Sequence, residues 1–117
     1  MGTRYLDRAE LDGTAISLHY RQADSYFIND EFVARLSIGA AFGLLYRCAL
    51  GEVIFHYNRE GQDVALHVTK EAFNGFFGLT EQQMTQLASD PDRFDVSPVH
   101  QVNESKQWEF YLQFTKD

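Results

Sequence analysis

The 117-residue chain contains one cysteine, Cys48, and no apolar run close to the roughly 18 residues that a membrane-spanning helix needs. A single cysteine cannot form an internal disulfide. The N-terminal stretch MGTRYLDRAE also lacks the apolar core and the cleavage pattern of a secretory signal. We therefore expect a protein of the reducing cytoplasm that does not enter a membrane. We expect Cys48 to be a buried, structural thiol near the end of a helix.

Basic residues are few. Ten Lys and Arg stand against seventeen Asp and Glu, which gives a net charge of −7. The basic residues are scattered singly along the chain, so we expect no direct binding to nucleic acid. The acidic surplus suits a basic partner, either a cationic protein surface or a nucleic-acid-binding groove that this chain would occupy.

Motifs with a defined chemistry are absent from the sequence. It has no CxxC, no GxSxG, no phosphate-binding glycine loop and no dinucleotide fingerprint. Acid–base catalysis could use Asp7, Glu10 or Glu109, but no spacing selects them. We accordingly predict a protein that is not an enzyme and that needs no cofactor.

Aromatic residues, by contrast, are abundant. Ten Phe, six Tyr and one Trp make up 15% of the chain, which favours one packed domain over residues 1–117. This supply exceeds what a small core usually needs. The surplus would line a ligand cavity or form an exposed patch. Phe76 and Phe77 are the first candidates, because they and Phe73 cannot all point the same way on one short helix.

The clearest local pattern lies in residues 52–68, where two alternating runs meet at Glu60 and Gly61. If these two residues form the loop of a hairpin, facing positions sum to 121 and Phe55 faces Leu66. A slip of one residue would reverse both faces, so the pattern predicts the register. Glycine in the second loop position accepts the positive φ of a tight turn.

The other segments are assigned by period, caps and turn residues. We expect a first hairpin over residues 4–11 and 14–21, with its turn at Asp12–Gly13 and with Ala9 facing Ile16, and then one long helix over residues 32–50 that is capped by Asn29, weakened at Gly39 and Gly43 and ended by Gly51. After the central hairpin, we expect a helix over Lys70–Phe77, capped by Thr69 and ended by Gly78, and a helix from the capping box at Thr80 to about Ser89. A weak edge strand over residues 96–102 and a strong strand over residues 107–114 complete the expected elements. The order ββ-α-ββ-αα-ββ predicts an α+β fold, with an antiparallel sheet built from hairpins and helices packed on one face.

Histidines provide one candidate site. His56 and His67 fall on the same face of the central hairpin, near Asn58 and Asp63. Two histidines and a carboxylate can bind zinc. Neither histidine has a typical ligand spacing, however, and nothing supplies a further ligand, so we expect a solvated sheet face and no metal site. The sequence does not place His19 or His100 relative to this pair.

The function that these observations favour is that of a small, acidic, cytosolic interaction protein of bacterial or phage type. Such a protein binds and modulates or inhibits another macromolecule, as inhibitors, immunity proteins and anti-defence proteins do. The expected interface residues are Asp90, Asp92, Asp95, Phe76 and Phe77. Two alternatives stay open: a small ligand-binding or enzymatic α+β domain with an aromatic-lined cavity, and a homodimeric structural subunit.

Overall fold

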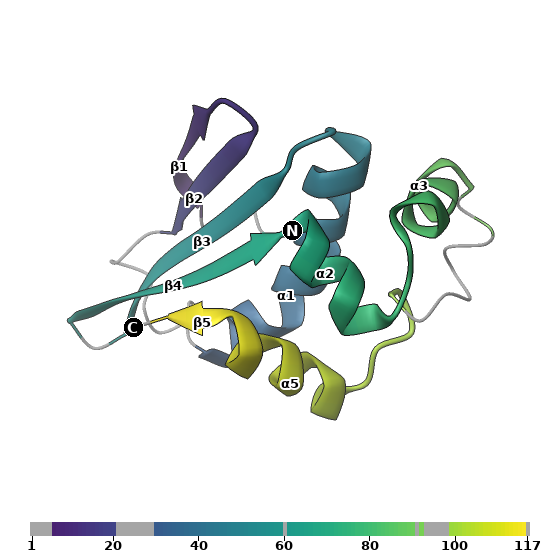
Figure 1. Cartoon of the computed structure of the whole chain (residues 1–117). Coiled ribbons are helices and arrows are strands. Elements are labelled where there is room, and N and C mark those ends of the chain that lie inside the picture. Colours follow the sequence, from purple (N-terminus) through teal and green to yellow (C-terminus); the bar gives the residue numbers. More distant parts are fainter. Residues whose placement is uncertain (1–5, 21–29, 60, 91, 93–98, 117) are drawn as a thin grey trace.

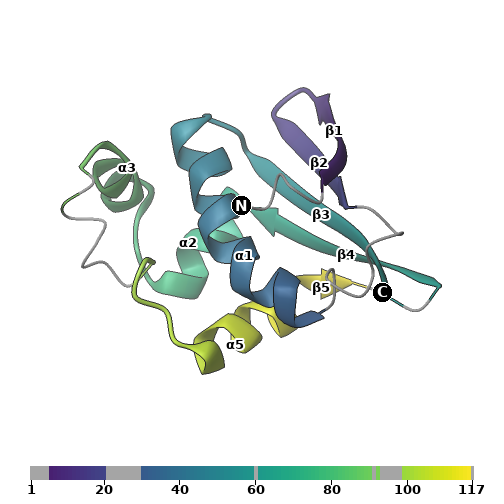
Figure 2. The ribbon, with the colours of Figure 1, turned by 180° about the vertical axis from the view of Figure 1, so that it is seen from behind.

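The fold is α+β: a mixed sheet carries its helices on one face (Figures 1 and 2). The computed structural model describes residues 6–20, 30–59, 61–90, 92 and 99–116. Its elements are β1 (Leu6–Asp12), β2 (Ala15–Tyr20), α1 (Asp30–Phe42), the π-helical turn η3 (Gly43–Arg47), β3 (Glu52–Arg59), β4 (Gln62–Thr69), α2 (Lys70–Phe77), α3 (Glu81–Ser89), α5 (Glu104–Phe114) and β5 (Thr115–Lys116). In this part of the chain, no helix is both long and apolar enough to cross a membrane.

The strands lie in chain order, β1-β2-β3-β4-β5, and three of the four junctions between them are antiparallel. The junction of β2 with β3 is parallel, so the prediction of a purely antiparallel sheet is wrong. The physical reason is the connection between them. A hairpin turn reverses the chain, but α1 and η3 return it to the end of the sheet from which β2 started, and the next strand then runs alongside.

The central hairpin has the predicted register. Phe55 pairs with Leu66, and the neighbouring pairs on the same face are Val53 with Val68 and Tyr57 with Val64. All six of these side chains are buried beneath the helices. Gly61 adopts φ 88° in the turn, and its N–H donates to the side-chain oxygen of Asn58 at 2.8 Å. This hairpin therefore forms the centre of the core.

The first hairpin exists, but its predicted register is wrong. Ala9 pairs with Leu18, not with Ile16, because the turn lies one residue later than Asp12–Gly13. Gly13 adopts φ 62°, a conformation that glycine accepts without strain. The ladder also shifts register near the start of β1. Together these changes place a small apolar residue, and not an aspartate, opposite the buried Leu18.

The long helix predicted over residues 32–50 ends earlier and changes form. α1 gives way to a π-helical turn at Gly43, and the N–H of Cys48 donates to the carbonyl of Gly43 at 3.1 Å. The left-handed residue after this turn is Ala49, with φ 57°, and not Gly51. Cys48 is exposed, so the prediction of a buried thiol is wrong. The predicted cap, Asn29, lies outside the described residues.

Gly51 instead allows a close approach between two strands. Its N–H donates to the carbonyl of Thr14 at 2.8 Å, where β3 begins to run beside β2. A Cβ at position 51 would lie 3.2 Å from the hydroxyl of Thr14, which is tighter than ordinary packing. The glycine therefore helps to bring the two hairpins together.

The caps predicted for the short helices are confirmed. The side chain of Thr69 accepts from the N–H of Ala72 at 3.2 Å, and Gly78 ends α2 with φ 68°. At the start of α3, Thr80 and Gln83 form the reciprocal hydrogen bonds of a capping box. These local signals fix both ends of α2 and the start of α3.

The strand predicted over residues 107–114 is wrong, because this segment is the helix α5. The side chain of Asn103 caps it by accepting from the N–H of Lys106 at 2.8 Å. Phe110 and Phe114, one helical turn apart, are buried, whereas Leu112 is 71% exposed. A strand would have placed all three on one face. Of the strand predicted over residues 96–102, positions 99–102 form a turn and a loop, and positions 96–98 lie outside the described residues.

Candidate functional site

Phe76 and Phe77, two of the expected interface residues, pack against the hydrophobic core. Both are half-buried. The ring of Phe76 meets that of Phe110 edge to face, with 5.1 Å between the centroids, and the ring of Phe77 lies 5.1 Å from that of Phe73. The ammonium group of Lys106 also lies 4.6 Å from the ring centroid of Phe76. These rings join α2 to α5, and their role in binding a partner stays a prediction.

The expected acidic residues lie after α3. Asp90 is half-buried at the C-cap of this helix, where its N–H donates to the carbonyl of Leu87 at 3.4 Å. Asp92 is exposed, and Asp95 lies outside the described residues. Their role in binding a partner stays a prediction.

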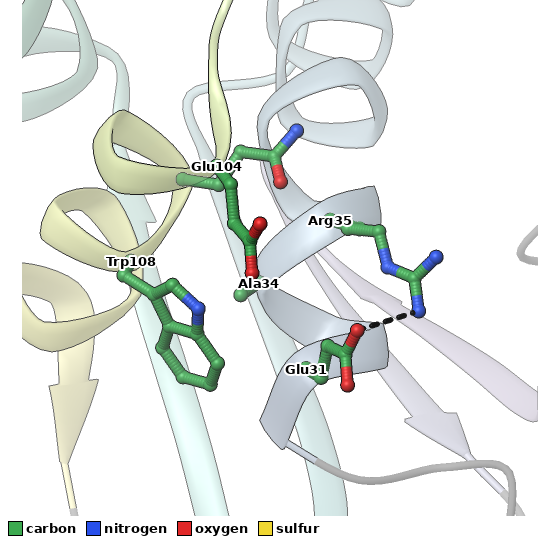
Figure 3. Close-up of a pocket in the computed structure, with 6 residues that line it drawn as sticks. Glu31, Ala34, Arg35, Glu104 and Trp108 are labelled. Carbon is green, nitrogen blue, oxygen red and sulfur yellow. Dashed lines mark hydrogen bonds and ion pairs between the residues drawn. The ribbon is translucent and has the colours of Figure 1, made fainter.

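A different surface combines an aromatic ring, carboxylates and an open hollow. It lies between α1 and α5 and has a volume of about 280 Å³ (Figure 3). We call it the Trp108 pocket, and its lining residues are Glu31, Ala34 and Arg35 from α1 and Glu104, Gln107 and Trp108 from α5. α1 and α5 lie side by side, and the pocket lies between them.

Each side of the Trp108 pocket carries a carboxylate. On α1, Glu31 accepts from the guanidinium of Arg35, one turn later, at 3.2 Å. On α5, Glu104 extends towards α1 and Ala34 in Figure 3. The half-buried Trp108 meets the ring of Tyr111 edge to face, with 5.4 Å between the centroids. The buried Tyr111 therefore supports the indole on its inner side. Among the lining residues that the structure describes, two carboxylates stand against one guanidinium, so these side chains together carry a net negative charge.

A second hollow, of about 250 Å³, continues along the same helices. It shares Arg35 and Gln107 with the Trp108 pocket. We call it the Arg47 pocket, and its other described lining residues are Ile38, Gly39, Arg47, Val99, His100 and Val102. No carboxylate is among these described lining residues. The two pockets together form what we call the α1–α5 groove.

The open face of the sheet carries three histidines, His19, His56 and His67. His19 and His56 stack with their ring centroids 4.4 Å apart and their planes 3° from parallel. His19 Nε2 lies 2.8 Å from Glu10 Oε1, an ion-pair distance, although its geometry is not that of a hydrogen bond. His67 Nδ1 lies 3.7 Å from Glu52 Oε2, which is an ion-pair distance. The ring partner of His56 is therefore His19, which the sequence could not place.

The environment of His56 lowers its pKa. Burial is the main cause, and the charges of His19 and His67 act in the same direction, whereas Asp63 and Glu10 oppose them. A hollow of about 390 Å³ opens beside the two stacked rings. Among the residues that the structure describes, no three histidine, cysteine or acidic side chains are arranged to hold a metal ion.

No family model matches the chain, and no curated protein or solved structure matches it either. Its function therefore has to be argued from its own geometry. The sequence pattern missed Trp108 and Glu104 as site residues, because it placed residues 107–114 in a strand. The signal was present: Asn103 is a good helix cap, and positions 104, 108 and 112 then share one helical face.

Proposed function

We propose that this chain is a non-enzymatic, cytoplasmic interaction protein that inhibits or modulates a partner protein by binding a basic segment of it in the α1–α5 groove. The observation that carries the proposal is that the half-buried Trp108 lines one pocket together with the carboxylates of Glu31 and Glu104. We thus place the proposed interface in the groove beside α5 and not at the phenylalanines of α2.

The chemistry of the Trp108 pocket suits an arginine or lysine side chain. A cation over an indole face gains about 0.5–1 kcal/mol at an exposed site and more when it is desolvated. A guanidinium can also form two parallel hydrogen bonds with one carboxylate. Tryptophan is among the residues that most often dominate the energy of an interface. Leu112, one turn beyond Trp108 and 71% exposed, extends the contact with apolar surface.

The charge on the rest of the surface supports a basic partner. Several basic side chains are already paired with acids: Arg8 with Glu10 at 3.4 Å and Lys70 with Glu81 at 3.3 Å. Because acidic residues outnumber basic ones by seven, such pairing leaves an excess of negative charge. A field of this sign accelerates the approach of a cationic partner and weakens as salt is added.

The aromatic-cavity alternative has less support. Phe42, Phe73 and Phe110 are fully buried and pack on one another, with 6.4 Å between the centroids of Phe42 and Phe73 and 5.9 Å between those of Phe73 and Phe110. These three phenylalanine rings, from α1, α2 and α5, therefore fill the space that an aromatic-lined cavity would need. The three hollows described above all open to solvent.

The test uses Trp108 as its own reporter, because it is the only tryptophan in the chain. Capped peptides rich in arginine, lysine or glutamate, matched in length, are titrated into the whole chain while Trp108 fluorescence is followed. We expect the arginine peptide to bind most tightly, the glutamate peptide not to bind, and added salt to weaken binding.

The variant Glu104→Gln should weaken arginine-peptide binding about fivefold, since removing one exposed charge-assisted contact costs about 1 kcal/mol. The matched control is Glu109→Gln on the same helix. Glu109 pairs with Lys106 at 3.7 Å and does not line the groove, so this variant should bind like the parent. Equal losses in the two variants, or no response of Trp108 to the arginine peptide, would refute the proposal.

A further inference from the structure

Leu112 lies on the same helix as Trp108 and continues the surface that the Trp108 pocket begins. Residues four apart on a helix lie one above the other, so Glu104, Trp108 and Leu112 form a row along α5, which we call the α5 row. Each step of this row is about 6 Å, and the whole row is therefore roughly 12 Å long. It begins with a carboxylate, continues with an indole and ends with an aliphatic side chain.

We infer that the bound basic segment is an amphipathic α-helix that lies along the α5 row, with an arginine at Glu104 and Trp108 and an apolar residue, such as leucine, at Leu112. This inference rests on the proposed function and goes further, because it specifies the conformation of the bound segment and a second residue in it.

The side chains of the α5 row are available to a partner. Glu104 is exposed, and none of the residues that the structure describes forms an ion pair with its carboxylate. Leu112 is exposed as well. Trp108 is half-buried, and its ring rests against that of the buried Tyr111, with 5.4 Å between the centroids. The indole is thus held in place before a partner arrives, so binding removes little of its conformational freedom.

A helical segment suits this surface better than an extended one. The Trp108 pocket is lined from α1 and α5, and an α-helix uses its backbone groups in hydrogen bonds within itself. An extended peptide laid on these helices would find no strand edge to pair with, so its own N–H and C=O groups would depend on water. A bound helix satisfies its backbone internally and presents only side chains to the groove.

The length of the α5 row sets the spacing of the two side chains on the bound helix. A helix presents the same face every seven residues, which span about 10.5 Å. This length fits a row of roughly 12 Å, because the long arginine side chain can reach the remaining distance. A spacing of four residues would span only about 6 Å, or half of the row. The favoured helix therefore carries its apolar residue and its arginine seven positions apart.

Charge determines which end of the row takes the arginine. Glu31 and Glu104 line the Trp108 pocket, whereas Leu112 lies one turn beyond Trp108 and outside this pocket. A guanidinium gains charge-assisted hydrogen bonds from a carboxylate. An apolar side chain placed against Leu112 removes the apolar surface of both from water. The arginine is thus directed towards Glu104 and the apolar residue towards Leu112.

The test measures three capped peptides of about 18 residues, long enough to form a helix, on the whole chain. In the aligned peptide, leucine and arginine are seven residues apart and share a face. In the rotated peptide, of the same composition, they are five residues apart and lie on different faces. In the third peptide, glutamine replaces the leucine. By Trp108 fluorescence and amide chemical shifts, we expect the aligned peptide to bind about fivefold more tightly than the other two.

The conformation of the bound peptide is a separate measurement. Circular dichroism of the mixture should show more helix than the sum of the two separate spectra, because binding stabilises the peptide helix. A version of the aligned peptide with proline between leucine and arginine cannot form one continuous helix, and it should lose the fivefold advantage. If the proline peptide binds as tightly as the aligned peptide, the helical segment is refuted.

Protein variants test the apolar end of the α5 row. Leu112→Ala should remove the advantage of the aligned peptide and leave binding of the rotated peptide unchanged, and Leu112→Met should retain most of that advantage. Leu11→Ala is the matched control, because Leu11 lies on β1 and is 66% exposed, close to the 71% of Leu112. It should change neither affinity. Glu104→Gln should weaken the aligned and rotated peptides alike. Thermal unfolding of each variant confirms that it is folded.

The outcomes distinguish this inference from the proposed function. If aligned and rotated peptides bind equally through Trp108, or if Leu112→Ala weakens both by the same factor, the helical partner is refuted and the proposed function stands. If no arginine peptide changes the fluorescence of Trp108, both are refuted. If the chain alone forms a dimer that Leu112→Ala dissociates, a second copy covers the α5 row and the inference is refuted. A fivefold preference that Leu112→Ala abolishes and Leu11→Ala preserves supports it.

Discussion

The imidazole rings of His19 and His56 stack face to face across the parallel junction of β2 and β3, with 4.4 Å between their centroids. This junction joins the first hairpin to the rest of the sheet. Two neutral imidazoles can stack in this way, whereas two imidazolium ions at the same distance would repel each other. Glu10 and Asp63 face the pair from β1 and β4 and partly offset that repulsion, and His67 adds to it.

We therefore predict that the free energy of unfolding decreases as the pH falls below about 6.5. The pKa of His56 is lower in the folded chain than its ordinary value of 6.5, chiefly because of burial. Between these two values the unfolded chain binds more protons, so protonation favours unfolding, and the loss is complete below the folded pKa. Urea unfolding between pH 8 and pH 5 measures the effect.

The variant His56→Gln should reduce this pH dependence. His100 is exposed and does not line the hollow beside the rings of His19 and His56, so His100→Gln should preserve the pH dependence. A histidine NMR titration gives the pKa of His56 directly. A value at or above 6.5 would contradict the prediction.

A second prediction concerns the buried side chains of Tyr57 on β3 and Tyr111 on α5, whose hydroxyl groups form a hydrogen bond between sheet and helix. Tyr111→Phe removes this bond and should cost about 1 kcal/mol of unfolding free energy. The double variant with Tyr57→Phe should cost less than the sum of the two single variants, because the bond can be lost only once. Denaturant unfolding of the four proteins measures the coupling, and additive costs would show that the contact contributes nothing.

A third prediction separates the helical structure of residues 104–114 from a strand. Phe110 contacts the rings of four other phenylalanines, including Phe76 and Phe114, and is fully buried. Phe110→Ala should therefore cost about 3–5 kcal/mol. Leu112→Ala, only two residues away, should change stability by less than about 0.5 kcal/mol, because that side chain is 71% exposed. In a strand the two residues would share a face, and comparable costs would support that arrangement instead.

A fourth prediction compares two exposed glycines at the end of α2. Gly78 has φ 68°, where a Cβ is strained, so Gly78→Ala should destabilise the chain by about 1 kcal/mol. Gly75 lies within α2 with open space around it, so Gly75→Ala should stabilise the chain by about 0.4–1 kcal/mol. Thermal unfolding measures both, and shifts of the same sign would contradict the assigned end of the helix.

The sequence predicted well those features that depend on local chemistry. The register of the central hairpin follows from paired apolar residues such as Phe55 and Leu66, and the caps at Thr69 and Thr80 follow from side chains that bond to nearby backbone. These patterns involve residues close in the chain, so the competing arrangements are few. Their outcome did not depend on how distant segments pack.

Features that depend on distant packing could not be predicted in the same way. The apparent alternation around Trp108 and Leu112 spans only eight residues, and the apolar Tyr111 between them fits a helix equally well. The parallel junction of β2 with β3 depends on where α1 ends, and no local pattern sets this. That junction brings His19 beside His56, so the stacking of the two histidines could not be predicted from local sequence patterns either.

The two edge strands of the sheet affect how the protein behaves in concentrated solution. At one edge, β1 carries the charged residues Asp7, Arg8, Glu10 and Asp12, and its pairing with β2 is irregular. On the other, the two-residue β5 covers β4 at Ala65 and Leu66. Charges and irregular edges discourage the addition of further strands. The sheet therefore resists growth into fibrils, and we expect the chain to remain dispersed at high concentration.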